Sequence, residues 1–134
     1  MPFQLAQELH PNEAKTILVA EDEDSNFLLI KELLSNTSFN ILRAINGQEA
    51  IDVCKKTPSI DIVLMDIKMP VMDGYEATRQ IKAFLPNLPI IAQTAYFLES
   101  DKNKAFESGC NDFVSKPFNK NVFLSKINTY LWSA

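Results

Sequence analysis

Short apolar runs alternate with helical patterns along the chain, and this alternation restricts the fold more than any other sequence feature. The runs are rich in β-branched residues and cover residues 16–20, 40–44, 60–65, 89–93 and 112–115. Several are almost continuously apolar, as strands are when helices cover both faces of their sheet. Helical spacing lies between them, at residues 24–34, 47–57, 73–84, 97–108 and 119–131. Five repeats of strand then helix predict a parallel sheet with helices on both faces.

The ends of the helical segments carry recognisable start and stop residues. Asp24 or Ser25 is the predicted N-cap of the first segment. Pro86 stops the third segment, and Gly109 follows the fourth as a C′ residue. The residues expected on the core face of the first helix are Asn26, Leu29, Ile30, Leu33 and Leu34.

Composition and charge exclude several classes of function. The net charge is -4 and the 13 Lys and Arg are scattered, which disfavours a nucleic-acid partner. No apolar run approaches the ~20 residues that cross a bilayer, so no membrane contact is expected. The N-terminus lacks signal-peptide features, and Cys54 and Cys110 form no CxxC pair, which predicts a cytoplasmic location. We expect residues 1–14 to be a leader or linker and residues 15–132 to form one domain.

Polar side chains follow four of the predicted strands where each strand ends. Glu21 and Asp22 follow the first, Asp66 the third, Thr94 the fourth and Lys116 the fifth. Because the carboxyl ends of parallel strands share one edge of a sheet, these residues are expected to lie close together.

The chemistry of this set points to a metal ion and a phosphoryl group. Clustered carboxylates repel one another unless a cation neutralises them. Oxygen ligands without His or thiolate favour a hard ion, here Mg2+, with Mn2+ as a second ion. Lys116 and Thr94 suit the oxygens of a phosphoryl group in transfer, and an aspartate can serve as the nucleophile that forms an acyl phosphate.

Three further segments match one family in order and spacing. They are Val-Leu-Met-Asp-Ile-Lys-Met-Pro-Val-Met-Asp-Gly at residues 63–74, Ile-Ile-Ala-Gln-Thr-Ala at 90–95 and Ser-Lys-Pro-Phe at 115–118. With Tyr-Glu-Ala-Thr-Arg at 75–79, the chain resembles the response-regulator receiver domains of the CheY-like superfamily, especially those of hybrid sensor histidine kinases. The resemblance implies a flavodoxin-like (CheY-like) doubly wound (βα)5 sandwich with strand order 2-1-3-4-5.

The resemblance also implies a role for each acidic residue. Asp66 would be the phosphoacceptor in a two-component phosphorelay. Asp22 would bind Mg2+ directly, and Glu21 would bind it directly or through water. The backbone carbonyl of Lys68 would supply another ligand.

A second set of residues would contact the phosphoryl group and report its presence. Lys116 would contact the group, and the Lys116–Pro117 bond would be cis as in relatives. Thr94 and Ala95 would lie at the phosphoryl oxygens. Thr94 would turn inward after transfer, and Phe113 stands at the position of the switch aromatic.

The chain departs from the family pattern at several positions. Glu21 stands where Asp is common, and Phe113 replaces a frequent Tyr, which removes any hydroxyl-dependent part of the switch. Lys68 and Tyr96 lie where relatives tune the lifetime of the acyl phosphate. We hypothesise that these bulky side chains slow dephosphorylation.

The implied partners are a histidine kinase or a histidine phosphotransfer domain. Phe27 and Leu28 add apolar surface to the first helix and are candidates for docking that partner. A homodimer would use the fourth helix, fifth strand and fifth helix, at residues 97–108, 112–115 and 119–131.

Other functions fit the sequence less well. A haloacid-dehalogenase-like phosphatase also uses an aspartate nucleophile, and Asp22-Glu-Asp24 faintly resembles its motif, but the segment around Asp66 stays unexplained. A flavin binder would need a Gly-rich phosphate loop where residues 21–24 are acidic. A receiver that only binds partners is disfavoured because every expected polar residue is present.

The molecular context has two interpretations. The resemblance favours a receiver excised from a hybrid sensor histidine kinase, and a stand-alone single-domain regulator is the alternative. His10 lacks the surroundings of a kinase phosphorylation box, so no kinase activity is expected of this chain. As an isolated module it would catalyse only its own phosphorylation and dephosphorylation.

Overall fold

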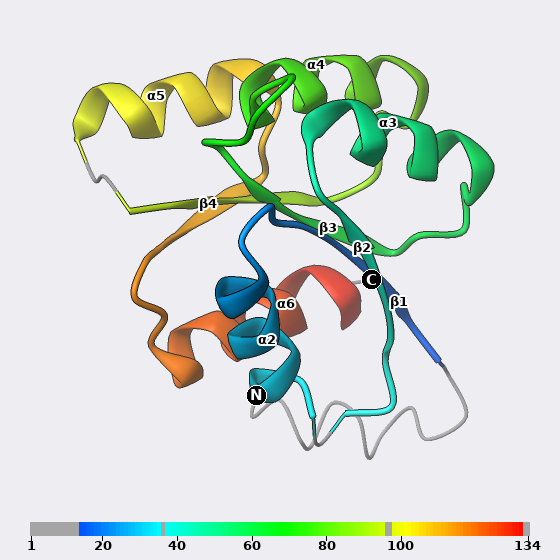
Figure 1. Cartoon of the computed structure of the whole chain (residues 1–134), viewed down its shortest axis with the longest axis vertical. Coiled ribbons are helices and arrows are strands. Elements are labelled where there is room, and N and C mark those ends of the chain that lie inside the picture. The colour runs from blue at the N-terminus through cyan, green and yellow to red at the C-terminus, as the bar shows by residue number, and fades with distance from the viewer. Residues whose placement is uncertain (1–13, 36, 96–97, 133–134) are drawn as a thin grey trace.

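The structure is a computed structural model that describes residues 14–35, 37–95 and 98–132. At its centre is one sheet of five parallel strands in the order β2-β1-β3-β4-β5 (Figure 1). The strands are β1 (Thr16–Ala20), β2 (Asn40–Ala44), β3 (Ile62–Asp66), β4 (Ile90–Thr94) and β5 (Asp112–Ser115). This order confirms the predicted flavodoxin-like, doubly wound (βα)5 sandwich.

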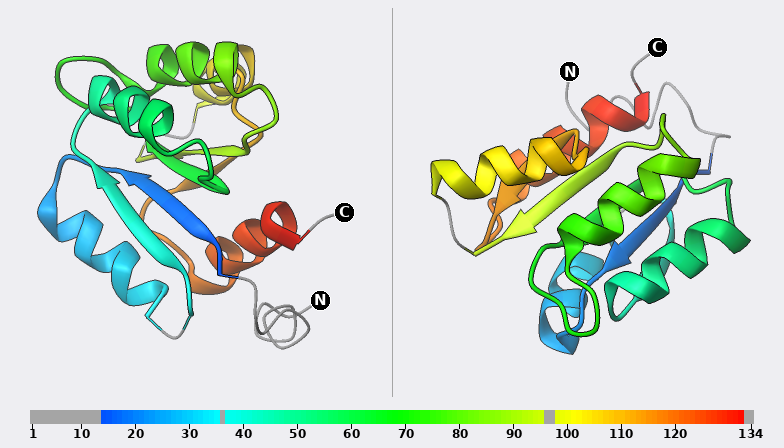
Figure 2. Two further views of the ribbon diagram at one scale, coloured as in Figure 1. Left: turned by 90° about the vertical axis from the view of Figure 1, so that its right-hand side faces the viewer. Right: turned by 90° about the horizontal axis from the view of Figure 1, so that it is seen from above.

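Helices cover both faces of the sheet. They are α2 (Asp24–Leu33), α3 (Gly47–Lys56), α4 (Gly74–Phe84), α5 (Glu99–Ser108) and α6 (Lys120–Trp132). Helices α3, α4 and α5 lie on one face, and α2 and α6 lie on the other (Figures 1 and 2). Within the described ranges, none of the helices has the length and apolar character needed to cross a bilayer.

Alternation along the strands builds a separate core on each face. In β1, Leu18 faces the α3–α5 layer and Val19 faces the α2 and α6 layer, and both are fully buried. All five residues of β3 are buried, as expected for the central strand of a sheet covered on both faces. Cys54 and Cys110 are buried free thiols.

Two strands end slightly later than predicted. The third covers residues 62–66 instead of 60–65, and the fourth covers 90–94 instead of 89–93. Ile60 closes a turn, in which its amide bonds the Thr57 carbonyl at 3.2 Å, and the Asp61 amide bonds the Thr16 carbonyl at 2.9 Å before the strand begins. The parallel ladder then runs far enough to pair Asp66 with Gln93, so Asp66 itself is a strand residue.

The predicted start and core face of the first helix were partly wrong. Its N-cap is Glu23, not Asp24 or Ser25, because the Phe27 amide bonds the Glu23 carbonyl at 3.0 Å and adds a residue to the first turn. Ile30 is fully buried, whereas Leu29 is 45% exposed. Successive helical residues point about 100° apart, so when Ile30 faces the sheet Leu29 points to its side.

Side-chain caps and a glycine define other helix ends. The Asn46 side chain accepts a hydrogen bond from the Glu49 amide at 2.8 Å, and Asp73 accepts one from the Glu76 amide at 2.9 Å. Gly109 ends α5 with a φ of 108°, which confirms its predicted place after the helix.

Gly74 allows the loop after β3 to close against the strand. Its amide donates to the Ile67 carbonyl at 2.9 Å. A Cβ at this position would overlap the Asp66 carbonyl oxygen. The loop that follows the predicted acceptor therefore depends on the absence of a side chain at residue 74.

Gly74→Ala is expected to lower the free energy of unfolding by about 1–3 kcal/mol, because the added methyl group forces the loop away from β3. Urea denaturation measures the change. Ser125→Ala on the exposed side of α6 is the control, with an expected change within about 0.5 kcal/mol. Equal stability of Gly74→Ala and the wild type would show that the loop can move to accommodate the methyl group without loss of stability.

Candidate functional site

The polar residues predicted from the strand ends gather at one edge of the sheet. Carboxylate oxygens of Glu21, Asp22 and Asp66 all lie within 4.8 Å of one another. The Lys116 ammonium lies 2.9 Å from Glu21 Oε1 and 3.4 Å from Asp66 Oδ2. Thr94 ends the neighbouring strand β4. The fold therefore brings together residues that are up to 95 positions apart in sequence.

Strand order explains this convergence. β1 and β3 are neighbours, β4 follows β3, and β5 forms the edge beyond β4. Lys116 directly follows β5, and its amide donates to the Thr94 carbonyl at 2.8 Å, which anchors the residue to the end of β4. From there its long side chain reaches Asp66 and Glu21.

Glu21 is completely buried and its carboxylate is held at both oxygens. Oε1 accepts from the Lys116 ammonium, and Oε2 accepts from the Glu23 amide at 3.2 Å. A buried carboxylate is costly unless it is paired and hydrogen-bonded. Lys116 and the loop after β1 therefore satisfy Glu21 while leaving its charge beside Asp66.

The Asp66 carboxyl group lies in an environment that disfavours its ionisation. Burial, together with the negative charge of Glu21 and a hydrogen bond to it, raises the pKa of Asp66 from 3.8 to about 7. The Lys116 charge and the Lys68 amide, which donates to Asp66 Oδ1 at 3.3 Å, oppose this rise in part. One ammonium does not balance three carboxylates, and a bound cation would lower this pKa.

Lys116 remains charged in this setting. Burial by itself lowers the pKa of Lys116, but the hydrogen bonds and negative charges of Glu21 and Asp66 outweigh burial and raise it above its ordinary value. The side chain is 17% exposed, so its positive charge is directed mainly at the two carboxylates.

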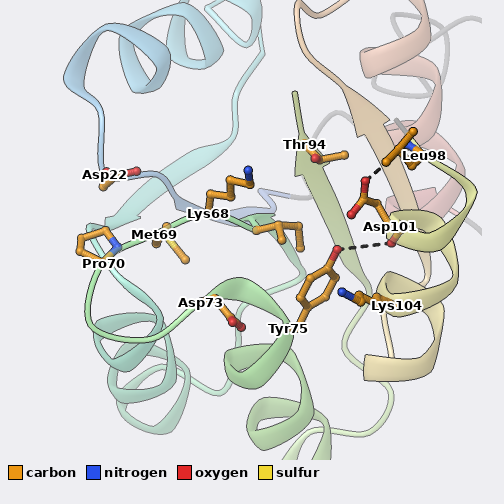
Figure 3. A pocket seen from close by; sticks show the side chains of 11 residues that line it. Asp22, Lys68, Met69, Pro70, Asp73, Tyr75, Thr94, Leu98, Asp101 and Lys104 are labelled. Atoms are coloured by element: carbon orange, nitrogen blue, oxygen red, sulfur yellow. Dashed lines mark hydrogen bonds between the residues drawn. The ribbon is translucent and has the colours of Figure 1, made fainter. Parts of the chain in front are cut away.

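A pocket of about 710 Å³ opens beside the cluster. Figure 3 shows Asp22, Lys68 and Thr94 around the upper part of this space, with Tyr75 and Asp101 facing it from α4 and α5. The Tyr75 hydroxyl donates to the Asp101 carbonyl at 3.4 Å and links the two helices. Asp22 is the carboxylate of the cluster that lines this pocket, so a small molecule or a side chain in the pocket can reach it.

The structure also places three of the remaining residues that the sequence assigned to a phosphoryl-dependent switch. The Lys116–Pro117 peptide bond is cis, as predicted. Ala95 is exposed at the end of β4. Phe113 is half-buried, with its ring edge-on to Phe106 at 5.9 Å. Tyr96 lies outside the described residues.

The ring of Phe113 also lies near two ammonium groups. The Lys126 ammonium is 4.6 Å from the ring centroid and the Lys102 ammonium is 5.5 Å from it. Lys126 donates in addition to the Phe113 carbonyl at 2.6 Å. Favourable cation–π geometry therefore holds the ring between α5 and α6.

The two candidate docking residues differ in exposure. Leu28 is 60% exposed, whereas Phe27 is half-buried and packs into the core beneath α2. The Arg43 guanidinium covers the Phe27 ring at 4.6 Å. The exposed apolar surface of α2 therefore consists of Leu28 and Leu29, and Phe27 belongs mainly to the core.

Two residues beside the site, Arg43 and Gln93, were not predicted from the sequence. Arg43 in β2 bonds the loop that carries Glu21 and Asp22. Gln93 in β4 is fully buried beside Asp66, and neither atom of its amide has a hydrogen-bond partner within the described part of the chain. The available signal was a polar residue near the end of an otherwise apolar run.

Comparison with known proteins identifies relatives along most of the chain. The family model described as the response regulator receiver domain matches residues 17–128. Hybrid signal transduction histidine kinase I of Dictyostelium discoideum is 43% identical over 123 residues, covering 86% of this chain and 7% of that protein. The polar-differentiation response regulator DivK of Brucella anthropi is 32% identical over 122 residues, covering 90% of this chain and 98% of that protein.

Two solved structures with the same fold contain, respectively, a magnesium ion and a partner protein. The receiver domain of sensor histidine kinase PA1611 from Pseudomonas aeruginosa, with magnesium in its active site cleft, has a TM-score of 0.80 and 32% identity over 90% of this chain and 100% of that chain. A co-crystal of the Saccharomyces cerevisiae histidine phosphotransfer protein Ypd1 with the receiver domain of Ssk1 has a TM-score of 0.82 and 31% identity, over 88% of this chain and 89% of that chain.

The family match and the DivK alignment each cover most of the described domain, and the observed strand order agrees with both. This chain therefore belongs to the response regulator receiver domain family of two-component systems.

Proposed function

We propose that this chain accepts a phosphoryl group on Asp66 from a phosphohistidine, as the receiver of a two-component phosphorelay. The observation that carries the proposal is the contact of Asp66 with a charged lysine inside a cluster of three carboxylates. A purely structural Asp–Lys pair would not need two more acids at the same edge of the sheet. This arrangement instead suits a nucleophile whose reaction brings in negatively charged oxygens.

Mg2+ fits the residues of the cluster. Glu21, Asp22 and Asp66 would hold it, and the carbonyl of Lys68 would add a fourth oxygen. Their carboxylates offer oxygen atoms within 4.8 Å of one another, and their charge exceeds that of Lys116 by two. When bound, Mg2+ supplies charge neutralisation for the phosphoryl oxygens. Mn2+ has the same preference for oxygen ligands.

The side chains divide the work of phosphoryl transfer. An Asp66 carboxylate oxygen would form the new P–O bond while the P–N bond to the donor histidine breaks, and the imidazole nitrogen leaves with the electrons of that bond. Lys116 would donate to a phosphoryl oxygen from its position 3.4 Å from Asp66. The Thr94 hydroxyl and the Ala95 amide would donate to another oxygen from the end of β4.

The response to phosphorylation would reach the face formed by α5, β5 and α6. Thr94 would turn toward the phosphoryl group, and Phe113 would follow into the space beside it. The ring of Phe113 already lies between Lys102 and Lys126, which come from the two helices of this face. The same face would serve in a homodimer.

The donor would be a histidine kinase or a histidine phosphotransfer domain. Leu28 and Leu29 on α2 offer it an exposed apolar surface next to the site. The co-crystal of Ypd1 with a receiver domain supports a partner of this kind. Lys68 is exposed beside the acceptor, in keeping with its suggested influence on dephosphorylation together with Tyr96.

The comparisons support two molecular contexts. The alignment with the Dictyostelium kinase covers 7% of that protein and favours a receiver within a hybrid histidine kinase. The alignment with DivK covers 98% of that protein and favours a stand-alone regulator. In either context, the chain would act on its own aspartate and not turn over a separate substrate. Against a phosphatase of the haloacid-dehalogenase type, Asp24 is 85% exposed and pairs with Arg43 instead of facing the cluster.

Incubation with acetyl phosphate and Mg2+ is expected to add one phosphoryl group to the wild-type protein, as measured by intact mass. Asp66→Asn should show no gain, because an amide is not a nucleophile of this kind. Asp52→Asn, an exposed aspartate on α3, is the control and should be labelled like the wild type. Full labelling of Asp66→Asn would refute the assignment, as would labelling that persists in the presence of a chelator.

Asp66→Asn is also expected to stabilise the metal-free protein increasingly as pH rises. The folded-state pKa of Asp66 lies near 7 and its ordinary value is 3.8, so between these values the unfolded chain releases a proton that the folded protein retains. Stability from this group is thus present at low pH and lost as pH rises toward about 7. The variant lacks this loss.

Thermal unfolding in a chelator, at acidic and at mildly alkaline pH, measures the difference in Tm between Asp66→Asn and the wild type. The difference should be larger at alkaline pH, and Asp52→Asn should show no such trend. Added Mg2+ should raise the Tm of the wild type more than that of Asp66→Asn. A Tm difference independent of pH would contradict the raised pKa.

A further inference from the structure

We propose that Arg43 is a positioning residue of the metal site, which holds the loop after β1 so that Glu21 and Asp22 point at the ion. The inference rests on the proposed function, since it concerns the binding of Mg2+ to the same cluster. Arg43 does not belong to the cluster and contacts its ligands through their backbone.

Strand pairing places Arg43 beside that loop. β2 is an edge strand, and Arg43 pairs with Val19 of β1, one residue before Ala20 ends that strand. Val19 faces the layer of α2 and α6, and neighbouring residues of a parallel pair face the same side. The Arg43 side chain therefore lies under the start of α2, where it is 24% exposed.

All three nitrogens of the guanidinium contact the acidic segment. Nε donates to the Glu21 carbonyl at 3.1 Å, and Nη2 is 3.4 Å from the Asp22 carbonyl. Nη1 forms an ion pair with Asp24 Oδ1 at 2.8 Å. The planar guanidinium thus spans residues 21, 22 and 24, a geometry that a lysine ammonium cannot reproduce.

The ring of Phe27 fixes the Arg43 guanidinium in place. The Arg43 guanidinium lies over the Phe27 ring at 4.6 Å, and Phe27 packs into the core beneath α2. Arg43 is thereby held between the ring and the loop, and loses little further freedom when it bonds the two carbonyls.

Holding these two carbonyls determines where the carboxylates point. The orientation of the peptide groups at Glu21 and Asp22 sets the direction of both side chains. The Glu21 carboxylate itself accepts from the Glu23 amide and from Lys116. Arg43 holds the backbone carbonyls of the same segment. Without it, repulsion among the three carboxylates would favour an open loop, and Mg2+ would have to close it.

The sign of the effect separates positioning from simple charge. A positive charge near a cation site weakens binding by repulsion, so removal of Arg43 should strengthen Mg2+ binding if only its charge matters. Removal should weaken binding if its hydrogen bonds position the ligands. The two explanations predict opposite changes in Kd.

The test is Mg2+ titration of the full chain by isothermal titration calorimetry. Arg43→Met keeps much of the apolar stem but removes the donors, and its Kd should rise about tenfold, in line with other residues that hold metal ligands. Arg43→Lys should give a Kd between those of Arg43→Met and the wild type. Arg79→Met removes an exposed arginine paired with Glu76 on α4, and should change the Kd by less than about twofold.

Asp24→Asn separates the ion pair from the carbonyl contacts. It leaves both hydrogen bonds of Arg43 to the loop in place, and its Kd should stay within about twofold of the wild type because Asp24 is 85% exposed. A tenfold loss in Asp24→Asn would assign the effect to the ion pair and overturn the role of the carbonyl contacts. Urea unfolding in a chelator checks that each variant is folded at the titration temperature.

The remaining outcomes are also decisive. A Kd for Arg43→Met equal to or below that of the wild type would overturn the positioning role while leaving the proposed function intact. If Arg43→Met proves to be unfolded, the Kd of Arg43→Lys decides instead. A Kd of Arg43→Lys equal to that of the wild type would then overturn the positioning role. Wild-type protein that binds no Mg2+ would overturn the proposed function, and this inference with it.

Discussion

The contact of the Lys116 ammonium with Glu21 and Asp66 is the interaction on which the site depends. At 2.9 and 3.4 Å it holds together the ends of β1, β3 and β5, which no local sequence connects. It also offsets the free-energy cost of burying Glu21 completely, because a buried carboxylate without a partner would be strongly destabilising. The rest of the edge of the sheet is arranged around this pair: the Lys68 amide bonds Asp66, and the Glu23 amide bonds Glu21.

Lys116 does not neutralise the carboxylates around it, and the excess of negative charge has chemical consequences. Three carboxylates face one ammonium, and the pKa of Asp66 rises to about 7 as a result of burial and of the neighbouring Glu21. A divalent cation would relieve this and return Asp66 to the ionised form that a nucleophile needs. The same excess of negative charge explains why Lys116 keeps its proton despite burial. The proposed metal binding and the proposed nucleophilicity of Asp66 would in this way both follow from one electrostatic arrangement.

The elements around this edge are linked to it by specific contacts. Arg43 joins the acidic loop to Phe27 and so to α2, the helix with exposed Leu28 and Leu29. On the other side, Phe113 lies between lysines of α5 and α6. The proposed donor surface and the proposed output surface therefore border the same few strand ends. This closeness follows from the parallel sheet, which places every strand-to-helix connection of the five repeats at one edge.

The sequence by itself determined the architecture and the members of the cluster. Period and composition predict five strands and five helices, and parallel strands place Glu21, Asp22, Asp66, Thr94 and Lys116 at one edge whatever their separation in sequence. Tertiary structure alone decided the exposure of Leu29, the burial of Gln93 and the reach of Arg43. These depend on the rotation of α2 about its axis and on which side chains meet across the layers. Periodicity does not encode such details, because they arise from packing between segments that are distant in sequence.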